Sequence, residues 1–188
     1  LINDDILKVD LKALISNNSQ FENVKVVANL PYYITTPIIM KLLENKLDLR
    51  SITVMVQKEV AQRLVETPGG KETGAITYSI NYYTDPELVL DVSKDSFIPS
   101  PKVDSAVIKL NILKQPKIQV TNEELFFKVI KCAFMQKRKT LVNSLSNSGI
   151  SSKETLENIL NELGIDTRIR AEQLSLEQFG YLSDKLDK

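Results

Sequence analysis

Short apolar runs alternate with amphipathic stretches along the first 113 residues of the chain. The runs Val24–Ala28 and Ser51–Gln57 have the length and the β-branched content of buried strands. Two later segments, Pro86–Ser93 and Asp104–Leu113, also predict strands, and the last one alternates in hydrophobicity as a half-buried strand does. Strands that alternate with helices are typical of an α/β protein, so we expect a mostly parallel sheet.

The segments between these runs predict helices. In "TTPIIMKLLE", Thr36 is the expected N-cap and Pro37 the expected first helical residue. A second helix is expected from Lys58 to Glu66. The pattern of Ala75–Tyr83 fits a strand or a helix, and we favour the helix.

The pattern changes after Lys114, where three capping-box signals each precede an amphipathic stretch. They pair Thr121 with Glu124, Ser151 with Glu154, and Ser175 with Gln178. We therefore expect a sheet-containing domain over residues 1–114 and a small all-α domain over residues 115–188.

The formal net charge is zero, but the charge is unevenly distributed. Residues 1–113 have net charge −2 and residues 114–188 have +2, and no acidic residue lies between Glu124 and Glu154. The densest basic cluster in that interval is Lys137, Arg138 and Lys139. By pattern alone, this cluster fits either an ordinary solvated surface or a binding patch for phosphates.

The chain contains one cysteine, Cys132, and no histidine. An internal disulfide is therefore excluded, and we expect a reducing, cytoplasmic setting. The absence of histidine excludes Ser-His-Asp and Cys-His catalysis and histidine metal sites, and a single cysteine excludes a zinc-thiolate site. No apolar run approaches the length of a membrane span.

The first predicted strand ends in Asn-Leu-Pro-Tyr, residues 29–32. In open α/β sheets, ligands bind at the carboxyl ends of strands. The Asn29 side-chain oxygen and the Leu30 backbone carbonyl are two acceptors that suit an exocyclic amine, and Pro31 fixes the turn. Tyr32 offers a flat face on which a nucleobase can stack. A pocket for an extruded adenine and a purely structural turn both fit these residues.

A proline-rich segment, "DSFIPSPKVDS", connects the last two predicted strands. Pro99 and Pro101 predict a rigid, extended loop. Phe97 at its start fits either a second aromatic face for a base or a plug beneath the loop.

Four motifs together resemble the family of small-subunit ribosomal RNA adenine dimethyltransferases. They are "NLPYYITTPIIMKLLE", "VQKEVAQRL", "FIPSPKVDSAVIKL" and "FMQKRKTLVNSL". The resemblance implies an enzyme that uses S-adenosylmethionine to convert two adjacent adenosines near the 3′ end of 16S rRNA to N6,N6-dimethyladenosine. It also implies a role in small-subunit biogenesis, with small-subunit rRNA in the subunit or its precursor as the partner. No metal is implied.

The same resemblance assigns roles to individual residues. The catalytic set would be Asn29, Leu30, Pro31, Tyr32 and Phe97. The cofactor contacts would be Asp5, Ile6 and Asn29, and the rRNA contacts would be Lys102, Lys137, Arg138 and Lys139. Catalysis in this family would depend on positioning and electrostatics, without a dedicated general base.

The chain departs from the family pattern in its glycines, because all six lie at Gly69 or later. No glycine-rich cofactor turn precedes Asn29. The fold expected is therefore a partial Rossmann-like methyltransferase sheet without its N-terminal strands, followed by the helical domain. We expect this chain alone to bind S-adenosylmethionine poorly, and the uncovered sheet favours self-association, although the oligomeric state stays open.

Two other functions remain open. One is a non-catalytic RNA-binding or ribosome-assembly factor, which the missing glycine-rich turn favours. The other is a large-subunit rRNA adenine methyltransferase that confers antibiotic resistance, since the motifs do not fix the choice of substrate.

Overall fold

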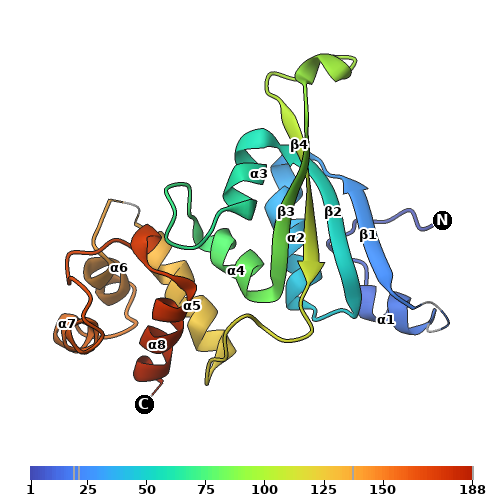
Figure 1. Ribbon diagram of the computed structural model, residues 1–188. Coiled ribbons are helices and arrows are strands. Elements are labelled where there is room, and N and C mark those ends of the chain that lie inside the picture. Colours follow the sequence, from blue (N-terminus) through green and yellow to red (C-terminus); the bar gives the residue numbers. More distant parts are fainter. Residues whose placement is uncertain (19, 21, 137, 188) are drawn as a thin grey trace. The chain divides into compact units, whose positions relative to one another are not determined.

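The computed structural model describes residues 1–18, 20, 22–136 and 138–187 of the chain. The chain forms two compact units (Figure 1). The first comprises residues 1–65 and 83–115, and the second comprises residues 66–82 and 116–188.

The first unit is built on a four-stranded sheet in the order β1-β2-β4-β3. The strands are β1 (Val24–Asn29), β2 (Leu49–Gln57), β3 (Thr84–Val92) and β4 (Ser105–Ile112). The α/β class is confirmed, but the expectation of a mostly parallel sheet is wrong. Only β1 and β2 pair in parallel, whereas β4 is antiparallel to both β2 and β3. The reason is that β3 and β4 are joined by a loop, residues 93–104, which contains only the short 3-10 helix η2 (Lys94–Ser96) and reverses the chain.

One face of this sheet carries the core of the first unit. Alternate residues of β2 and β4 are completely buried on it, in register across the strand pair: Ile52, Val54, Val56, Ala106, Ile108 and Leu110. Helices α2 (Thr35–Glu44) and α3 (Lys58–Val65) lie on the same side of the sheet in Figure 1, and α1 (Leu11–Ser16) precedes β1. On the opposite face of β1, the Val27 side chain is 78% exposed. The period-2 burial therefore places Asn29 on the exposed face of its strand.

Helix α2 begins earlier than expected, so the prediction of Thr36 as its N-cap is wrong. A short 3-10 helix, η1 (Tyr32–Ile34), runs directly into α2, and its last residue, Ile34, is the N-cap of α2. The Pro31 carbonyl accepts hydrogen bonds from the Ile34 N–H at 3.1 Å and from the Thr35 hydroxyl at 3.3 Å. The prediction of Pro37 as the first helical residue is also wrong, because α2 begins at Thr35 and Pro37 is its third residue. Pro37 still lies in the first turn, where backbone N–H groups have no partner within the helix.

The second unit is all-helical in its described residues. Its elements are α4 (Ala75–Tyr83), α5 (Glu123–Phe134), α6 (Leu141–Asn147), α7 (Lys153–Glu162), the 3-10 helix η3 (Ala171–Gln173) and α8 (Leu176–Leu186). The capping box of Ser175 and Gln178 is confirmed.

The other two predicted boxes are wrong by one residue, because Asn122 and Ser152 are the N-caps. The Thr121 N–H is bonded instead to the Asp184 carboxylate at 2.8 Å, and asparagine caps a helix better than threonine does.

The segment 66–82 belongs to the helical unit, which the predicted division at residues 114 and 115 did not anticipate. The Tyr78 ring is completely buried against Phe179, with ring centroids 4.8 Å apart. The Tyr78 hydroxyl donates to the carbonyls of Ala171 and Leu174, and burial raises the pKa of this phenol well above its usual value. The helix favoured for Ala75–Tyr83 is confirmed, and its contacts are with segments about 100 residues later in the chain.

Candidate functional site

A pocket of about 340 Å³ lies at the carboxyl end of β1, and we call it the base pocket. It is lined by Asn29, Leu30, Pro31, Tyr32, Phe97, Pro99 and Pro101. The structure thus brings together all five residues of the expected catalytic set. Four come from the end of β1, and Phe97 comes from loop 93–104, which returns to this edge because β4 is antiparallel to β2.

Asn29 and Leu30 present two hydrogen-bond acceptors at the base pocket. The Leu30 N–H donates to the Met55 carbonyl of β2 at 3.4 Å, and the Leu30 side chain is buried, which holds the turn against the sheet. Within the described part of the chain, neither the Asn29 side-chain amide nor the Leu30 carbonyl oxygen makes a hydrogen bond. Both groups therefore keep their capacity to bind a ligand.

Tyr32 is anchored by a residue that the sequence did not point to. The Tyr32 hydroxyl lies 2.7 Å from the Ser105 Oγ, and Ser105 is completely buried at the start of β4. This bond limits rotation of the ring at the edge of the base pocket. The only local signal was a serine at the second position of the predicted strand Asp104–Leu113, and such serines are too common to single one out.

We expect Ser105→Ala to lower the free energy of unfolding by about 1 kcal/mol, since one hydrogen bond between part-buried groups is lost. Tyr32→Phe should lower it by about the same amount, and the double variant by no more than either single one. Urea unfolding followed by circular dichroism measures all three values. Additive losses in the double variant would contradict the anchoring role of Ser105.

The expected cofactor contacts Asp5 and Ile6 lie outside the base pocket, in an N-terminal turn. The Asp5 carboxylate accepts the Leu7 N–H at 3.0 Å and is exposed, beside the half-buried Ile6. An exposed carboxylate next to an apolar side chain suits the amine edge and the flat face of an adenine, so these residues fit that end of S-adenosylmethionine. Lys41 of α2, which sequence reasoning missed, fixes the turn by donating to the carbonyls of Leu7 at 2.7 Å and Val9 at 2.8 Å.

Lys102, an expected rRNA contact, does not line the base pocket. It lines a separate pocket of about 320 Å³ together with Gln57, Lys58, Glu59, Lys94, Val103 and Asp104. Lys102 and Phe97 are thus carried by the same loop but line different pockets.

The basic cluster of the second unit lies just before α6. Arg138 and Lys139 are both exposed there, whereas Lys137 lies outside the described residues. The Leu141 N–H donates to the Ile169 carbonyl at 2.8 Å, which brings a second basic segment, Arg168–Arg170, beside this one. Sequence reasoning missed this segment, whose signal is two arginines that flank one isoleucine.

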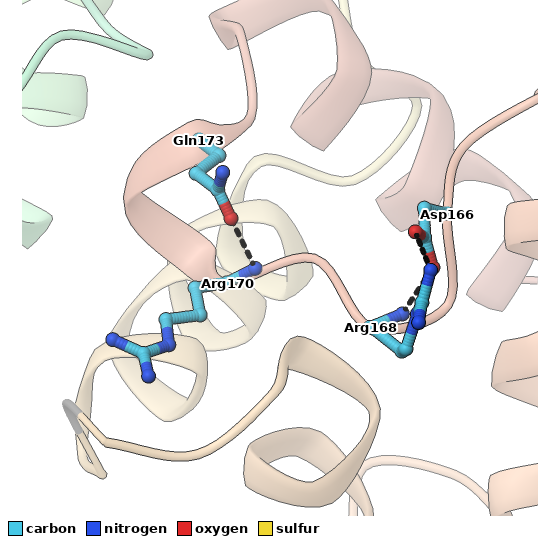
Figure 2. A network of polar contacts seen from close by, with 4 residues as sticks. All are labelled: Asp166, Arg168, Arg170 and Gln173. Carbon is cyan, nitrogen blue, oxygen red and sulfur yellow. Dashed lines mark hydrogen bonds and ion pairs between the residues drawn. The ribbon is translucent and has the colours of Figure 1, made fainter.

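The two arginines of that segment differ in their surroundings (Figure 2). Arg168 pairs with Asp166 at 3.0 Å, and its hydrogen bonds hold the pKa of Asp166 below the usual value. The Arg170 backbone N–H donates to the Gln173 side chain at 2.9 Å, while its guanidinium points away from the Asp166–Arg168 pair in Figure 2. Arg170 is therefore the better placed of the two to bind an external anion.

Two further findings concern the described residues as a group. None of their helices combines the length and the apolar character needed to cross a bilayer. No group of three or more acidic or cysteine side chains in this part of the chain is arranged to hold a metal ion.

Comparison with solved structures gives the fold. A dimethyladenosine transferase from Plasmodium falciparum superimposes with a TM-score of 0.75 at 24% identity, over 96% of this chain and 70% of that one. The 23S rRNA methyltransferase ErmE superimposes with a TM-score of 0.65 at 21% identity, over 100% of this chain and 71% of that one. At these identities the likeness supports the methyltransferase fold alone.

Comparison with sequences is more specific. The ribosomal RNA small subunit methyltransferase A of Alkaliphilus oremlandii is 48% identical over 100% of this chain, and that of Bacillus cereus strain B4264 is 50% identical over 99%. The chain spans 66% and 65% of the lengths of these relatives. The model of the ribosomal RNA adenine dimethylase family matches residues 1–188. The chain therefore belongs to the ribosomal RNA adenine dimethylase family.

Proposed function

We propose that the protein is an rRNA adenine-N6,N6-dimethyltransferase that acts on two adjacent adenosines near the 3′ end of 16S rRNA in the cytoplasm. Its partner is the small ribosomal subunit or a precursor of it, and its activity contributes to subunit biogenesis. The observation that carries this proposal is the base pocket, where the Asn29 side-chain oxygen and the Leu30 carbonyl, which accept no hydrogen bond from a described residue, share one cavity with Tyr32 and Phe97.

The dimensions and chemistry of the base pocket suit an adenine taken out of its stack. Its volume of about 340 Å³ lies at the lower end of the range for small-ligand sites. Tyr32 and Phe97 are both half-buried, so each keeps part of its ring accessible for stacking on a base. The acceptors at Asn29 and Leu30 match the two N–H donors of the adenine amine, which cytosine also has but guanine presents at another position.

The residues of the chain would promote transfer by holding the adenine amine. S-adenosylmethionine supplies a methyl group on a sulfonium, whose leaving group is neutral. The adenine amine is a weak nucleophile because its lone pair is delocalised into the ring. Hydrogen bonds to the Asn29 side-chain oxygen and the Leu30 carbonyl favour a pyramidal nitrogen, whose lone pair is more available. The Tyr32–Ser105 bond and the rigid Pro99–Pro101 loop keep the base aligned, so positioning supplies much of the effect.

The helical unit would bind the rRNA backbone. Arg138, Lys139 and Arg170 supply positive charge around the start of α6, and Lys137 belongs to the same basic run of sequence. Contacts of this kind position a complex without reading its sequence.

The direct test uses small subunits that lack dimethyladenosine, S-adenosylmethionine, and a form of this protein with the full length of its relatives. We expect N6,N6-dimethyladenosine in the nucleoside digest of the 16S rRNA by mass spectrometry. RNA binding without methyl incorporation would favour the assembly-factor alternative, and modification of 23S rRNA instead would favour the resistance enzyme. Calorimetric titration of both the 188-residue chain and the longer form with S-adenosylhomocysteine would show which of them holds the cofactor.

A further inference from the structure

The pocket that contains Lys102, which we call the lysine pocket, has no role in the function proposed above. It lies in the first unit and is lined by Gln57, Lys58, Glu59, Lys94, Lys102, Val103 and Asp104. Loop 93–104 borders both pockets, because Pro99 and Pro101 line the base pocket while the residues that directly follow them line the lysine pocket.

The charges in the lysine pocket leave two ammonium groups for a ligand. Glu59 pairs with Arg63 at 3.0 Å, and the Asp104 carboxylate accepts the backbone N–H of Lys94 at 3.0 Å. Lys58 pairs with Asp91 at 3.0 Å.

Within the described residues, the side chains of Lys94 and Lys102 make no ion pair or hydrogen bond. The acidic groups are thus engaged, and the free groups are donors that carry positive charge.

One buried residue, Ser105, links the linings of the two pockets. Gln57 at the end of β2 pairs with Ser105 in the sheet, and the Ser105 hydroxyl is bonded to Tyr32 of the base pocket. The two pockets are therefore neighbours in the first unit, with the Tyr32–Ser105 pair between the base pocket and Gln57.

We propose that the lysine pocket binds a backbone phosphate next to the adenosine in the base pocket, through Lys94 and Lys102. This inference rests on the proposed function. The lysine pocket is lined by no aromatic side chain, so it does not suit a second stacked base. Lysine is a common phosphate ligand, and a phosphate contact would fix the register of the strand and hold the target nucleotide extruded.

The test measures the affinity of the purified protein for a short single-stranded RNA with one adenosine, by fluorescence anisotropy. The double variant Lys94→Gln/Lys102→Gln should bind about 10-fold more weakly than the unmodified protein. Its plot of log affinity against log salt concentration should be less steep by about 0.7, the value for one lost phosphate contact on a single strand. The control Lys12→Gln/Lys25→Gln removes the same charge from two exposed lysines of the first unit that line neither pocket.

A neutral methylphosphonate placed on either side of the adenosine identifies the phosphate. At one of these positions it should weaken binding to the unmodified protein by about 10-fold and leave binding to the Lys94→Gln/Lys102→Gln variant unchanged. If the methylphosphonate weakens binding to the Lys94→Gln/Lys102→Gln variant as much as it weakens binding to the unmodified protein, the phosphate site is wrong. It is also wrong if the control variant Lys12→Gln/Lys25→Gln loses as much RNA affinity as Lys94→Gln/Lys102→Gln does.

Replacement of the adenosine by uridine separates this result from the proposed function. If uridine lowers the affinity, but the methylphosphonate and the lysine substitutions weaken binding independently of each other, the phosphate site alone is overturned. Affinity that does not depend on the adenosine, or no binding of RNA at all, overturns base recognition and with it the phosphate site that rests on it.

Discussion

Asn29→Ala is expected to lower the rate of methyl transfer about 100-fold while RNA affinity stays within about two-fold of the unmodified protein. The Asn29 side chain is exposed at the base pocket and bonds to no other described group, so its removal should leave the fold intact. What is lost is the acceptor that we propose holds the reacting amine. The rate is measured as N6-methylation of unmodified small subunits, and RNA affinity by anisotropy.

Two further variants make this result specific. Asn29→Asp keeps an accepting oxygen at the same position and should retain more activity than Asn29→Ala. Asn158→Ala changes an exposed asparagine on α7 and should leave the rate unchanged. If Asn29→Ala weakens RNA binding and leaves the rate of bound complexes unchanged, Asn29 acts in binding alone and the mechanism proposed for it is wrong.

Phe97→Ala is expected to weaken binding of the target adenosine about 5- to 150-fold, because stacking on an aromatic ring contributes about 1–3 kcal/mol per base. Phe97 is half-buried and lines the base pocket. It is the only aromatic residue in loop 93–104. The loss should appear as a raised KM for the RNA substrate and as weaker binding of adenosine-containing RNA by anisotropy.

The neighbouring residue offers a matched control for this prediction. Ile98 is a fully exposed hydrophobic side chain of the same loop and lies outside the base pocket. Ile98→Ala should therefore leave binding unchanged, and Phe97→Tyr should restore most of the affinity that Phe97→Ala loses. Equal losses for Phe97→Ala and Ile98→Ala would mean that the loop contributes general apolar surface and that Phe97 does not stack on the base.

The sequence was most informative about local structure. The strands at Val24–Ala28 and Ser51–Gln57 are predictable because short runs rich in β-branched residues favour extended backbone. The expectation that Val24–Ala28 is a buried strand is wrong, because one face of β1 is exposed. Ser175 and Gln178 were identified as a capping box because the bonds they make join residues three positions apart. The motif at residues 29–32 could be interpreted for the same reason, since its acceptors and its ring are adjacent in the chain.

The direction of strands and the first residues of helices were harder to predict from the sequence. The antiparallel course of β4 follows from the path of loop 93–104, whereas the alternating pattern of a strand is the same in both directions. Thr121 met the pattern for an N-cap, but Asp184 of a later helix engages its N–H, so that Asn122 became the cap.

By itself, the sequence determined the α/β class, the helical C-terminal part, the chemistry excluded by the absence of histidine, and the residues of the Asn-Leu-Pro-Tyr turn. Only the tertiary structure decided that Phe97 shares a cavity with that turn, that Ser105 anchors Tyr32, that Lys102 belongs to a second pocket, and that segment 66–82 packs with the helices. The physical reason is common to all four. Each depends on contacts between residues far apart in the chain, and those are fixed by which buried faces fit together rather than by any local pattern.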